Sequence, residues 1–309
     1  MRETFLAPVS ELDLKKTFEC GQCFRWKAAP DGAYTGVAFG RALKLHETGG
    51  AVYCDAPLCE LPFWRRYFDL DADYSALARS FTDPQYLRDC AANGRGIRIL
   101  RQEVWEALCS FILSQCNNIP RIKKIVSALC LRFGTPLSGG EFTFPGASRL
   151  APLSENELLP LRMGYRAAYV LEAARRVDSG TLDLEALDAL PGDEAFAKIR
   201  ELPGVGDKVA NCFLLYSLHK MDRFPVDVWM RRALKAHFPP DYDPSVLGPG
   251  AGLAQQYIFY YERANGREPK TENCAHCEKQ HRQISVSKNA KNRQTAKNKK
   301  FGTKASIPR

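Results

Sequence analysis

Lys208 and Asp227 are the two residues of this sequence whose types and spacing best suit covalent chemistry together. Lys208 comes just before an apolar stripe with helical spacing, so we expect it in the first turn of a helix. The positive end of the helix dipole and partial burial both disfavour a charged amine there. A neutral amine is the form that attacks carbon and makes a Schiff base. Asp227 precedes a second helical pattern and fits an N-cap, which by itself would also explain it.

A glycine-containing turn between two helical patterns places this lysine. The helix formers of residues 192–200 are followed by Pro203 and Gly204, which end a helix. We expect Gly204 and Gly206 to take positive φ angles in a tight reversal around Val205. Backbone N–H groups at the start of the next helix would then bind an anion, phosphate above all. Because glycine turns between helices are common, a connection without function is an equal alternative.

Net charge says little about partners here. The 309 residues, of which 45% are hydrophobic, can bury one large core or two modest ones. The formal net charge is +9, but residues 279–309 hold ten Lys and Arg and no acid. Removing these ten leaves 34 basic against 35 acidic residues, a net charge of −1 for residues 1–278. Any nucleic-acid face must therefore be a local patch.

Composition also bears on the compartment. No stretch approaches the roughly 18 apolar residues of a membrane span. The N-terminus lacks the apolar run of a signal peptide. The eleven cysteines are an odd number and are scattered along the chain, which suits a reducing compartment better than a disulfide framework. We therefore expect no membrane partner.

The periodicity of apolar residues changes along the chain and predicts an α+β fold. Alternation predicts strands, with Gly49-Gly50 as a hairpin turn, in residues 24–27, 34–39, 43–46 and 52–54. A helical period follows, most clearly in residues 61–95, 103–133, 165–177, 192–200, 208–216 and 253–263. We predict a small antiparallel sheet domain at 1–92 packed on a mostly helical domain at 93–270 with the helix-hairpin-helix. The basic tail at 271–309 is too poor in apolar residues to order.

The run Leu-Pro-Gly-Val-Gly-Asp-Lys, a helix, and then Pro-Val-Asp resembles the helix-hairpin-helix DNA glycosylase superfamily. The resemblance covers about residues 10–265. It implies that Lys208 attacks C1′ of a damaged nucleotide and expels the base, leaving an imine that permits strand cleavage by β-elimination. It implies that Asp227 stabilises the positive charge on the sugar and helps to orient the lysine. A lysine at this place marks the bifunctional glycosylase/lyase branch.

Further segments resemble one branch, the 8-oxoguanine DNA glycosylases. The resemblance implies that the carbonyl of Gly21 accepts from N7–H of the damaged base. Guanine N7 is an acceptor, whereas the 8-oxo form carries a proton there, so one acceptor distinguishes the two. Gln255 is implied to bind the Watson–Crick edge, with Phe259 on one ring face and Cys212 on the other. From residue types alone, Gly21 would be a turn glycine, and Phe259 and Cys212 would be ordinary core.

Residues 110–121, Ser-Phe-Ile-Leu-Ser-Gln-Cys-Asn-Asn-Ile-Pro-Arg, resemble the segment that contacts the cytosine left unpaired when the damaged base leaves. The resemblance gives Arg121 this contact and places Asn117 and Asn118 in the asparagine run before it. Cys116 replaces the first asparagine of that run, so the hydrogen bond of that asparagine and a strict preference for cytosine are no longer implied. Loop and cap chemistry between two helices would explain the asparagines without DNA.

Residues 163–169, Met-Gly-Tyr-Arg-Ala-Ala-Tyr, form the last matching segment. The resemblance makes Tyr165 a wedge into the base stack and Arg166 a second contact to the orphan cytosine. An interhelical turn followed by a solvated arginine is the structural alternative. Relatives often carry His two residues after the aspartate, where this chain has Trp229, so a phosphate contact of that histidine is missing or replaced.

We expect no metal and no organic cofactor. Several members of the superfamily carry a four-cysteine iron–sulfur loop after the catalytic helices, whereas this chain has only Cys274 and Cys277 there. A zinc site that joins these two to Cys20 and Cys23 fits by spacing. We disfavour it because Cys20 and Cys23 flank the pocket glycine.

These observations predict a monomeric bifunctional DNA glycosylase/AP lyase that excises 8-oxoguanine opposite cytosine from duplex DNA in base-excision repair. Two alternatives stay open: a glycosylase for another damaged or mispaired purine, and a DNA-binding hairpin protein without catalysis. We expect the protein in the cytoplasm with the nucleoid if the source is bacterial, and in the nucleus if it is eukaryotic.

Overall fold

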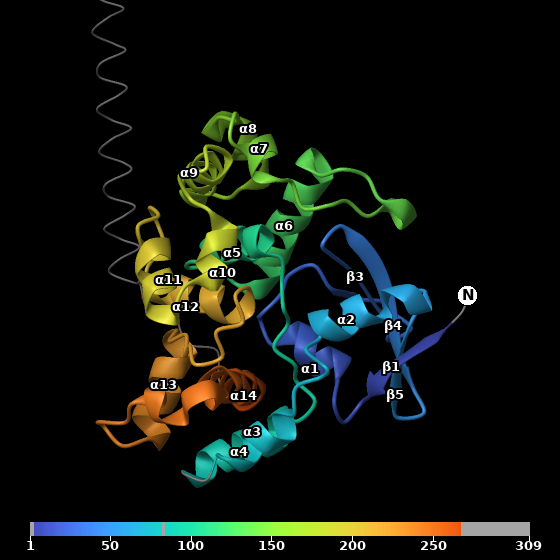
Figure 1. The fold of residues 1–309 in the computed structure, drawn as a ribbon, viewed down its shortest axis with the longest axis vertical. Helices are drawn as coiled ribbons and strands as arrows, with labels where there is room; N and C mark the ends of the chain where they lie inside the picture. The colour runs from blue at the N-terminus through green and yellow to red at the C-terminus, as the bar shows by residue number, and fades with distance from the viewer. Residues whose placement is uncertain (1–2, 82–83, 267–309) are drawn as a thin grey trace, which may run out of the picture. The chain divides into compact units, whose positions relative to one another are not determined.

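The structure, a computed structural model, describes residues 3–81 and 84–266. The predicted basic tail, with Cys274 and Cys277, lies outside these residues. Figure 1 shows an N-terminal antiparallel sheet (blue) followed by a helical part that runs to the C-terminal end of the described chain. The predicted α+β class is confirmed. The boundaries proposed at residues 92 and 270 stay predictions.

The sheet has five strands in the order β1-β5-β4-β3-β2, and all neighbours are antiparallel. Gly49 and Gly50, both at positive φ, form the predicted two-residue hairpin turn. The sheet is completed at one edge by a strand that the sequence analysis did not expect, β1. The strands are β1 (Thr4–Pro8), β2 (Lys27–Ala28), β3 (Tyr34–Ala38), β4 (Arg41–Thr48) and β5 (Ala51–Cys54).

The strand expected at residues 24–27 is wrong for most of its length, because β2 begins only at Lys27. Residues 21–26 form an irregular loop in which Phe24, Arg25 and Trp26 are all buried. The alternation of apolar and basic types therefore did not reflect alternating exposure. Arg25 is covered because its guanidinium pairs with Glu106 and donates to the carbonyl of Phe142.

Two helices, α1 (Leu14–Glu19) and α2 (Leu61–Tyr67), complete the core of the sheet subdomain. Side chains of both helices join strand residues in one hydrophobic cluster. Trp26 stacks on Phe18 of α1 at 4.3 Å and donates its indole N–H to the hydroxyl of Tyr67 of α2.

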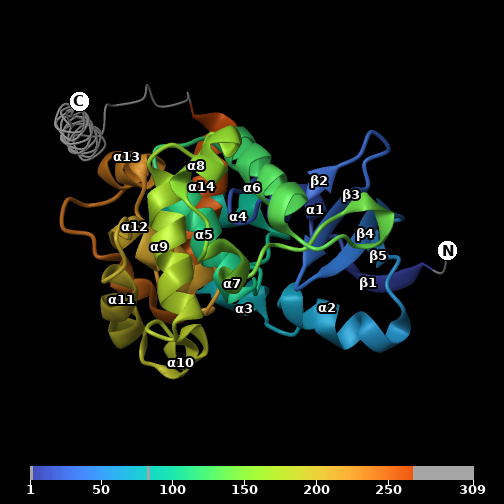
Figure 2. The ribbon, with the colours of Figure 1, turned by 90° about the horizontal axis from the view of Figure 1, so that it is seen from above.

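The remaining helices enclose a second, larger hydrophobic cluster. Figure 2 shows the sheet with α1 and α2 at one side of the molecule and these helices at the other. None of the described helices is long and apolar enough to cross a membrane. The helices are α3 (Tyr74–Arg79), α4 (Gln85–Gly94), α5 (Val104–Leu113), α6 (Ile119–Phe133), α7 (Ala147–Leu150), α8 (Glu155–Leu158), α9 (Arg166–Asp178), α10 (Leu184–Ala189), α11 (Gly192–Arg200), α12 (Asp207–Tyr216), α13 (Val228–His237) and α14 (Ala251–Asn265).

Helix α3 precedes the proposed domain boundary at residue 92 and helix α4 crosses it, yet both belong to the helical cluster. Cys90 of α4 is fully buried in it, and Gly94 lies so close to Tyr257 of α14 that a Cβ would meet the ring at 2.3 Å. The N-terminal third of the chain therefore supplies part of the helical core.

Buried polar groups join the sheet subdomain to the helices. The Gln22 amide donates to the carbonyls of Thr17 and Arg98 and accepts from the N–H of Leu100 at 2.9 Å. The backbone carbonyl of Gln22 accepts from the side chain of Gln102. Because an unpaired buried polar group is costly, these bonds fix the loop that carries Gly21.

Asp69 forms a second junction. It follows α2, is 6% exposed, and binds Arg101 at 2.9 Å, the Tyr74 hydroxyl at 2.9 Å and Nε2 of His219 at 3.1 Å. His219 follows α12, so Asp69 connects the sheet subdomain to that helix. Burial raises the pKa of Asp69, but the hydrogen bond and charge of His219, the charge of Arg101 and the Tyr74 hydrogen bond outweigh it and lower the pKa to about 2.

Asp69→Asn is expected to lower the free energy of unfolding by about 2 kcal/mol at pH 7, as the depressed pKa implies. A carboxylate whose folded pKa is depressed stabilises the fold above its unfolded pKa and loses this effect as pH falls through the folded pKa. The deficit measured by urea unfolding should therefore shrink towards pH 2. Asp71→Asn, at an exposed ion pair with Arg65, is the control and should stay within about 0.5 kcal/mol of native. A deficit of Asp69→Asn that is the same at every pH would contradict this account.

Candidate active site

The helix-hairpin-helix lies between α11 and α12. Gly204 has a φ of +83° and lies against Tyr169 of α9, whose ring a Cβ would meet at 2.2 Å. The turn is closed by the N–H of Val205, which donates to the carbonyl of Leu202 at 3.0 Å. The expectation for Gly204 is confirmed. The expectation of a positive φ at Gly206 is wrong, since Gly206 is the extended N-cap of α12 with a φ of −94°.

Lys208 lies in the first turn of α12 and is half-buried. Its amine donates to Oγ of Ser114 at 3.1 Å and lies 5.7 Å from the ring centroid of Phe111. Ser114 donates its own proton to the carbonyl of Phe111 at 2.7 Å. The serine oxygen therefore presents a lone pair to the lysine. Among the described residues, the amine of Lys208 has no ion-pair partner. The sequence analysis missed this role of Ser114, although the residue lies within the segment 110–121.

Asp227 caps α13, as predicted, and its Oδ1 accepts from the N–H of Met230 at 2.9 Å. Within the described chain, Asp227 and Lys208 form no direct ion pair. Both charges nevertheless act on the buried thiol of Cys212. Burial raises the pKa of Cys212, the charge of Lys208 lowers it, and the charge of Asp227 raises it. Lys208 and Cys212 lie one turn apart on α12, and Asp227 is the N-cap of α13.

Gly21 and Phe259, which are far apart in the sequence, are in contact. A Cβ on Gly21 would lie 3.1 Å from Phe259 of α14 and 3.1 Å from Ile119 of α6. Gly21 also has a φ of +83°, a conformation that favours glycine. The guanidinium of Arg263 lies 5.7 Å from the centroid of the Phe259 ring and donates to the carbonyl of Glu19. The loop before Gly21 is thereby held on α14.

Gln255 lies one turn before Phe259 on α14 and is 4% exposed. Its carboxamide oxygen is 3.0 Å from the hydroxyl of Tyr216, which lies one turn after Cys212 on α12. The Tyr216 ring stacks on Phe111 at 5.3 Å, and Phe111 is the ring that faces Lys208. The base-pocket residues expected from the sequence thus converge with the lysine, through aromatic residues that the sequence analysis did not select.

The asparagines after α5 are held by the ends of helices. Asn118 is the N-cap of α6 and accepts from the N–H of Arg121 at 2.9 Å. Asn117 donates to the carbonyl of Leu113 at 3.0 Å. Arg121 is exposed, and its guanidinium donates to the carbonyl of Arg162 at 3.1 Å. Cap chemistry accounts for Asn118 in this structure, and a contact of these residues with an orphan base stays a prediction.

Arg166 is buried rather than solvated. Its guanidinium stacks against Tyr165 at 4.5 Å and donates to the carbonyls of Gln115, Cys116 and Met163. Burial lowers the pKa of Arg166. The structural alternative of a solvated arginine is therefore wrong. Arg166 fixes the turn that carries Cys116, and its contact with cytosine, like the wedge role of Tyr165, stays a prediction.

Comparison with known proteins decides the family. The model "8-oxoguanine DNA glycosylase, N-terminal domain" matches residues 4–108, and the model "HhH-GPD superfamily base excision DNA repair protein" matches residues 109–246. An N-glycosylase/DNA lyase of Arabidopsis thaliana is 34% identical over 273 residues, which cover 82% of this chain and 74% of the relative. The chain belongs to the 8-oxoguanine DNA glycosylase family of the helix-hairpin-helix superfamily.

Two further members of this family are similar to the chain. The N-glycosylase/DNA lyase of Saccharomyces cerevisiae is 32% identical over 262 residues, which cover 74% of this chain and 69% of the relative. The Clostridium acetobutylicum 8-oxoguanine glycosylase/lyase was solved with double-stranded DNA containing cytosine opposite 8-oxoG. That structure superposes with a TM-score of 0.78 and 34% identity, covering 82% of this chain and 93% of the other.

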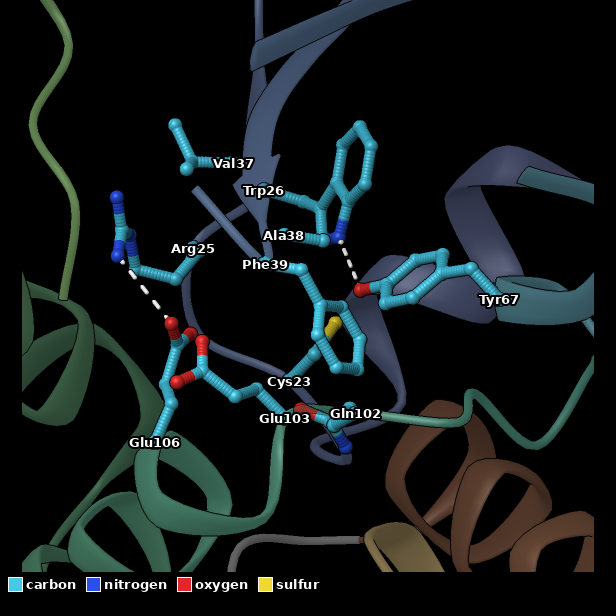
Figure 3. Close-up of a pocket in the computed structure, with 10 residues that line it drawn as sticks. All are labelled: Cys23, Arg25, Trp26, Val37, Ala38, Phe39, Tyr67, Gln102, Glu103 and Glu106. Carbon is cyan, nitrogen blue, oxygen red and sulfur yellow. Dashed lines mark hydrogen bonds and ion pairs between the residues drawn. The ribbon is translucent and has the colours of Figure 1, made fainter. Parts of the chain in front are cut away.

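A separate small cavity lies where the loop before β2 meets the start of α5 (Figure 3). Arg25 points to Glu106 and pairs with it at 3.3 Å, and Glu103 lies beside the pair. Burial raises the pKa of Glu106 to about 7, although the charge of Arg25 lowers it. None of the predicted site residues of this glycosylase family lines the cavity, so we assign the carboxylates to the subdomain junction. Among the described residues, no cluster of His, Cys, Asp or Glu could hold a metal ion.

Gly21→Ala is expected to lower activity far more than stability. The positive φ alone costs roughly 1–2 kcal/mol for an L-residue. The added Cβ also presses on Phe259 and Ile119, which displaces one wall of the base pocket. Gly32→Ala is the matched control, because Gly32 has a φ of +82° and nothing within 4 Å of a Cβ. Gly21→Ala should lose at least as much stability in urea as Gly32→Ala, but only Gly21→Ala should lose excision rate. Equal rates would contradict the pocket role of Gly21.

Proposed function

We propose that this protein excises 8-oxoguanine opposite cytosine from duplex DNA and then cleaves the strand at the abasic site. It is a bifunctional N-glycosylase/AP lyase of base-excision repair. One observation carries the assignment of chemistry to residues. The amine of Lys208 is held by the neutral hydroxyl of Ser114 at the exposed end of a buried helix, and the charges of Lys208 and Asp227 both act on the buried thiol of Cys212.

The proposed reaction starts with the neutral amine of Lys208. One N–H donates to Ser114, so the nitrogen lone pair is available to attack C1′ of the nucleotide. The N-glycosidic bond breaks, and its electron pair leaves with the base, which takes up a proton. The carboxylate of Asp227 stabilises the positive charge that develops on the sugar. Ring opening gives a Schiff base between Lys208 and C1′, loss of a C2′ proton then expels the 3′ phosphate, and hydrolysis of the imine releases the lysine.

Recognition of the base is proposed to depend on four residues. The carbonyl of Gly21 accepts from N7–H of 8-oxoguanine and would oppose the lone pair of guanine N7. Phe259 and Cys212 cover the two faces of the base, and Gln255 binds its Watson–Crick edge. Because a site built for a hydrogen bond strongly rejects an analogue that lacks the donor, one carbonyl can separate the damaged from the normal base.

The alternatives from the sequence are less well supported. A non-catalytic DNA-binding hairpin protein would not need an amine oriented by Ser114 together with a carboxylate at the cap of the next helix. A glycosylase for another purine would not need an acceptor at Gly21 packed against Phe259. Excision measured on duplexes with 8-oxoguanine, an alkylated purine and mispaired adenine decides between them, and preference for either of the last two would reject the assignment.

We also propose that the protein acts as a monomer and is located with the DNA: with the nucleoid in a bacterial source, or in the nucleus of a eukaryotic one. The grouping of all site residues within one chain supports the monomer. Light scattering of the purified protein tests the oligomeric state, and fluorescence microscopy of a tagged protein tests the location.

Borohydride should trap a covalent adduct between the native protein and a duplex with 8-oxoguanine opposite cytosine, because it reduces the Schiff base. Lys208→Gln should give no adduct and no strand cleavage in a denaturing gel. The exposed lysine of α11 provides a control, since Lys198→Gln removes a similar charge outside the site and should trap normally. An undiminished adduct from Lys208→Gln would rule out Lys208 as the nucleophile.

Asp227→Asn should lower single-turnover excision roughly 100-fold or more, as expected when charge stabilisation in the transition state is lost. Asparagine is as good an N-cap as aspartate, so α13 and the stability of the protein should be retained. Binding of the duplex, measured by fluorescence anisotropy, should change little. Asp183→Asn, at the N-cap of α10, is the matched control and should leave excision unchanged. Full turnover by Asp227→Asn would remove the assigned role.

A further inference from the structure

We propose that Tyr216 is a positioning residue that turns the Gln255 carboxamide so that its oxygen, and not its NH₂ group, faces the base. This orientation makes the pocket select purines with N–H donors on their Watson–Crick edge. The inference rests on the proposed function and extends it to a residue that does not touch the base.

Tyr216 connects α12 to α5 and α14, three of the helices around the lysine. It lies on α12 two turns after Lys208 and is 4% exposed. Its ring stacks on Phe111 with an interplanar angle of 22°. Its hydroxyl lies between two neighbouring side chains of α14, at 3.0 Å from Oε1 of Gln255 and 2.7 Å from Oε1 of Gln256.

A tyrosine hydroxyl has one proton, so it can donate to only one of the two oxygens. Burial, with a smaller contribution from Cys212, keeps the pKa of Tyr216 well above its usual value, so this single proton stays in place at neutral pH. The glutamine oxygen that receives no proton then lies at hydrogen-bond distance from a lone pair of the Tyr216 oxygen, and the two repel each other. A half-turn of that carboxamide replaces this repulsion with an N–H···O bond, because the oxygen and nitrogen of an amide exchange places.

Gln256 is not the one that turns. Its Nε2 donates to the backbone carbonyl of Cys20 at 3.0 Å, in a fully buried environment. A half-turn would place its oxygen against that carbonyl and leave both without a donor. Oε1 of Gln256 therefore faces Tyr216 and takes the proton, which also agrees with the shorter of the two distances.

Gln255 has no such restraint. Within the described chain, the side chain of Gln255 is hydrogen-bonded to the protein only through the Tyr216 hydroxyl, so a half-turn breaks no bond of its Nε2. After the half-turn, Nε2 donates to the Tyr216 oxygen, and Oε1 takes the place where Nε2 stood. The pocket then presents an acceptor.

An acceptor at this position distinguishes purines by their edges. Guanine and 8-oxoguanine carry N–H donors at N1 and N2, which an amide oxygen accepts. Adenine and 8-oxoadenine have a lone pair at N1, which the same oxygen repels. Both 8-oxopurines carry a proton at N7, so the contact with Gly21 treats them alike. The preference for 8-oxoguanine over 8-oxoadenine therefore isolates the contribution of Gln255.

Two variants test the proposal from opposite sides of the hydroxyl. Tyr216→Phe removes the group that holds Gln255, so both orientations become available. Gln256→Met removes the competing acceptor, so Tyr216 can donate to Gln255 and turn the NH₂ group towards the base.

The measurement is single-turnover excision from duplexes with 8-oxoguanine or 8-oxoadenine opposite cytosine. We expect the ratio of the two rates to fall about tenfold in Tyr216→Phe, the value of one hydrogen bond of about 1.4 kcal/mol, and further in Gln256→Met.

Controls separate positioning from loss of structure. Tyr67→Phe removes a buried tyrosine hydroxyl in the sheet subdomain, where it accepts from Trp26, and should leave the ratio unchanged. Borohydride trapping on a duplex with an abasic site needs no base recognition and should stay at the native level in Tyr216→Phe and Gln256→Met.

The outcomes also separate this inference from the proposed function. If the native protein traps neither the 8-oxoguanine nor the abasic duplex, the proposed function fails. If the native protein excises 8-oxoguanine and both variants slow the two substrates equally, Tyr216 is merely structural and the inference is overturned. Should Tyr216→Phe not fold, Gln256→Met decides by the same ratio.

Discussion

The burial of helix α12 is the constraint on which the rest of the site depends. From Val209 to Tyr216 every residue except Asn211 is buried, and the first turn is the most exposed part of the helix. An amine needs desolvation to be a nucleophile but must also reach a nucleotide. Both needs are met only at the end of a buried helix, where Lys208 lies. Because the helix cannot shift within a close-packed core, the position of this amine is set by apolar contacts on other turns.

The pocket around the lysine is assembled across a junction between two hydrophobic clusters. Gly21 comes from the loop between α1 and the sheet, Ser114 from the end of α5, and Gln255 and Phe259 from α14. Buried hydrogen bonds hold these segments together, among them those of Gln22, Asp69 and Gln256. Such bonds have a strict geometry, and a buried polar group left unpaired is costly. They therefore specify one arrangement of the segments, which apolar packing alone would leave less defined.

Local patterns predicted several elements correctly. The hairpin at Gly49-Gly50, the positive φ of Gly204 and the N-cap at Asp227 depend on short-range backbone chemistry, and each was found as expected. The strand expected at 24–27 failed because alternation of residue type does not report exposure when a loop is buried on both sides. The prediction of a positive φ at Gly206 was wrong because Gly204 alone completes the reversal of the chain. The alternative that Arg166 is exposed to solvent was wrong because carbonyls of a turn distant in the sequence accept from its guanidinium.

The sequence by itself determined the chemistry available to this protein, an amine in the first turn of a helix after a glycine hairpin and a carboxylate at the cap of the next helix. These features are encoded within about 30 residues, at the range where helix caps and turns operate. Only the tertiary structure decided which groups surround the amine, namely Ser114 beside Lys208, Gly21 against Phe259, and Tyr216 between two glutamines. These contacts join residues up to about 240 positions apart. Their geometry depends on side-chain packing and on the number of hydrogen-bond donors and acceptors that meet, and a local sequence pattern predicts neither.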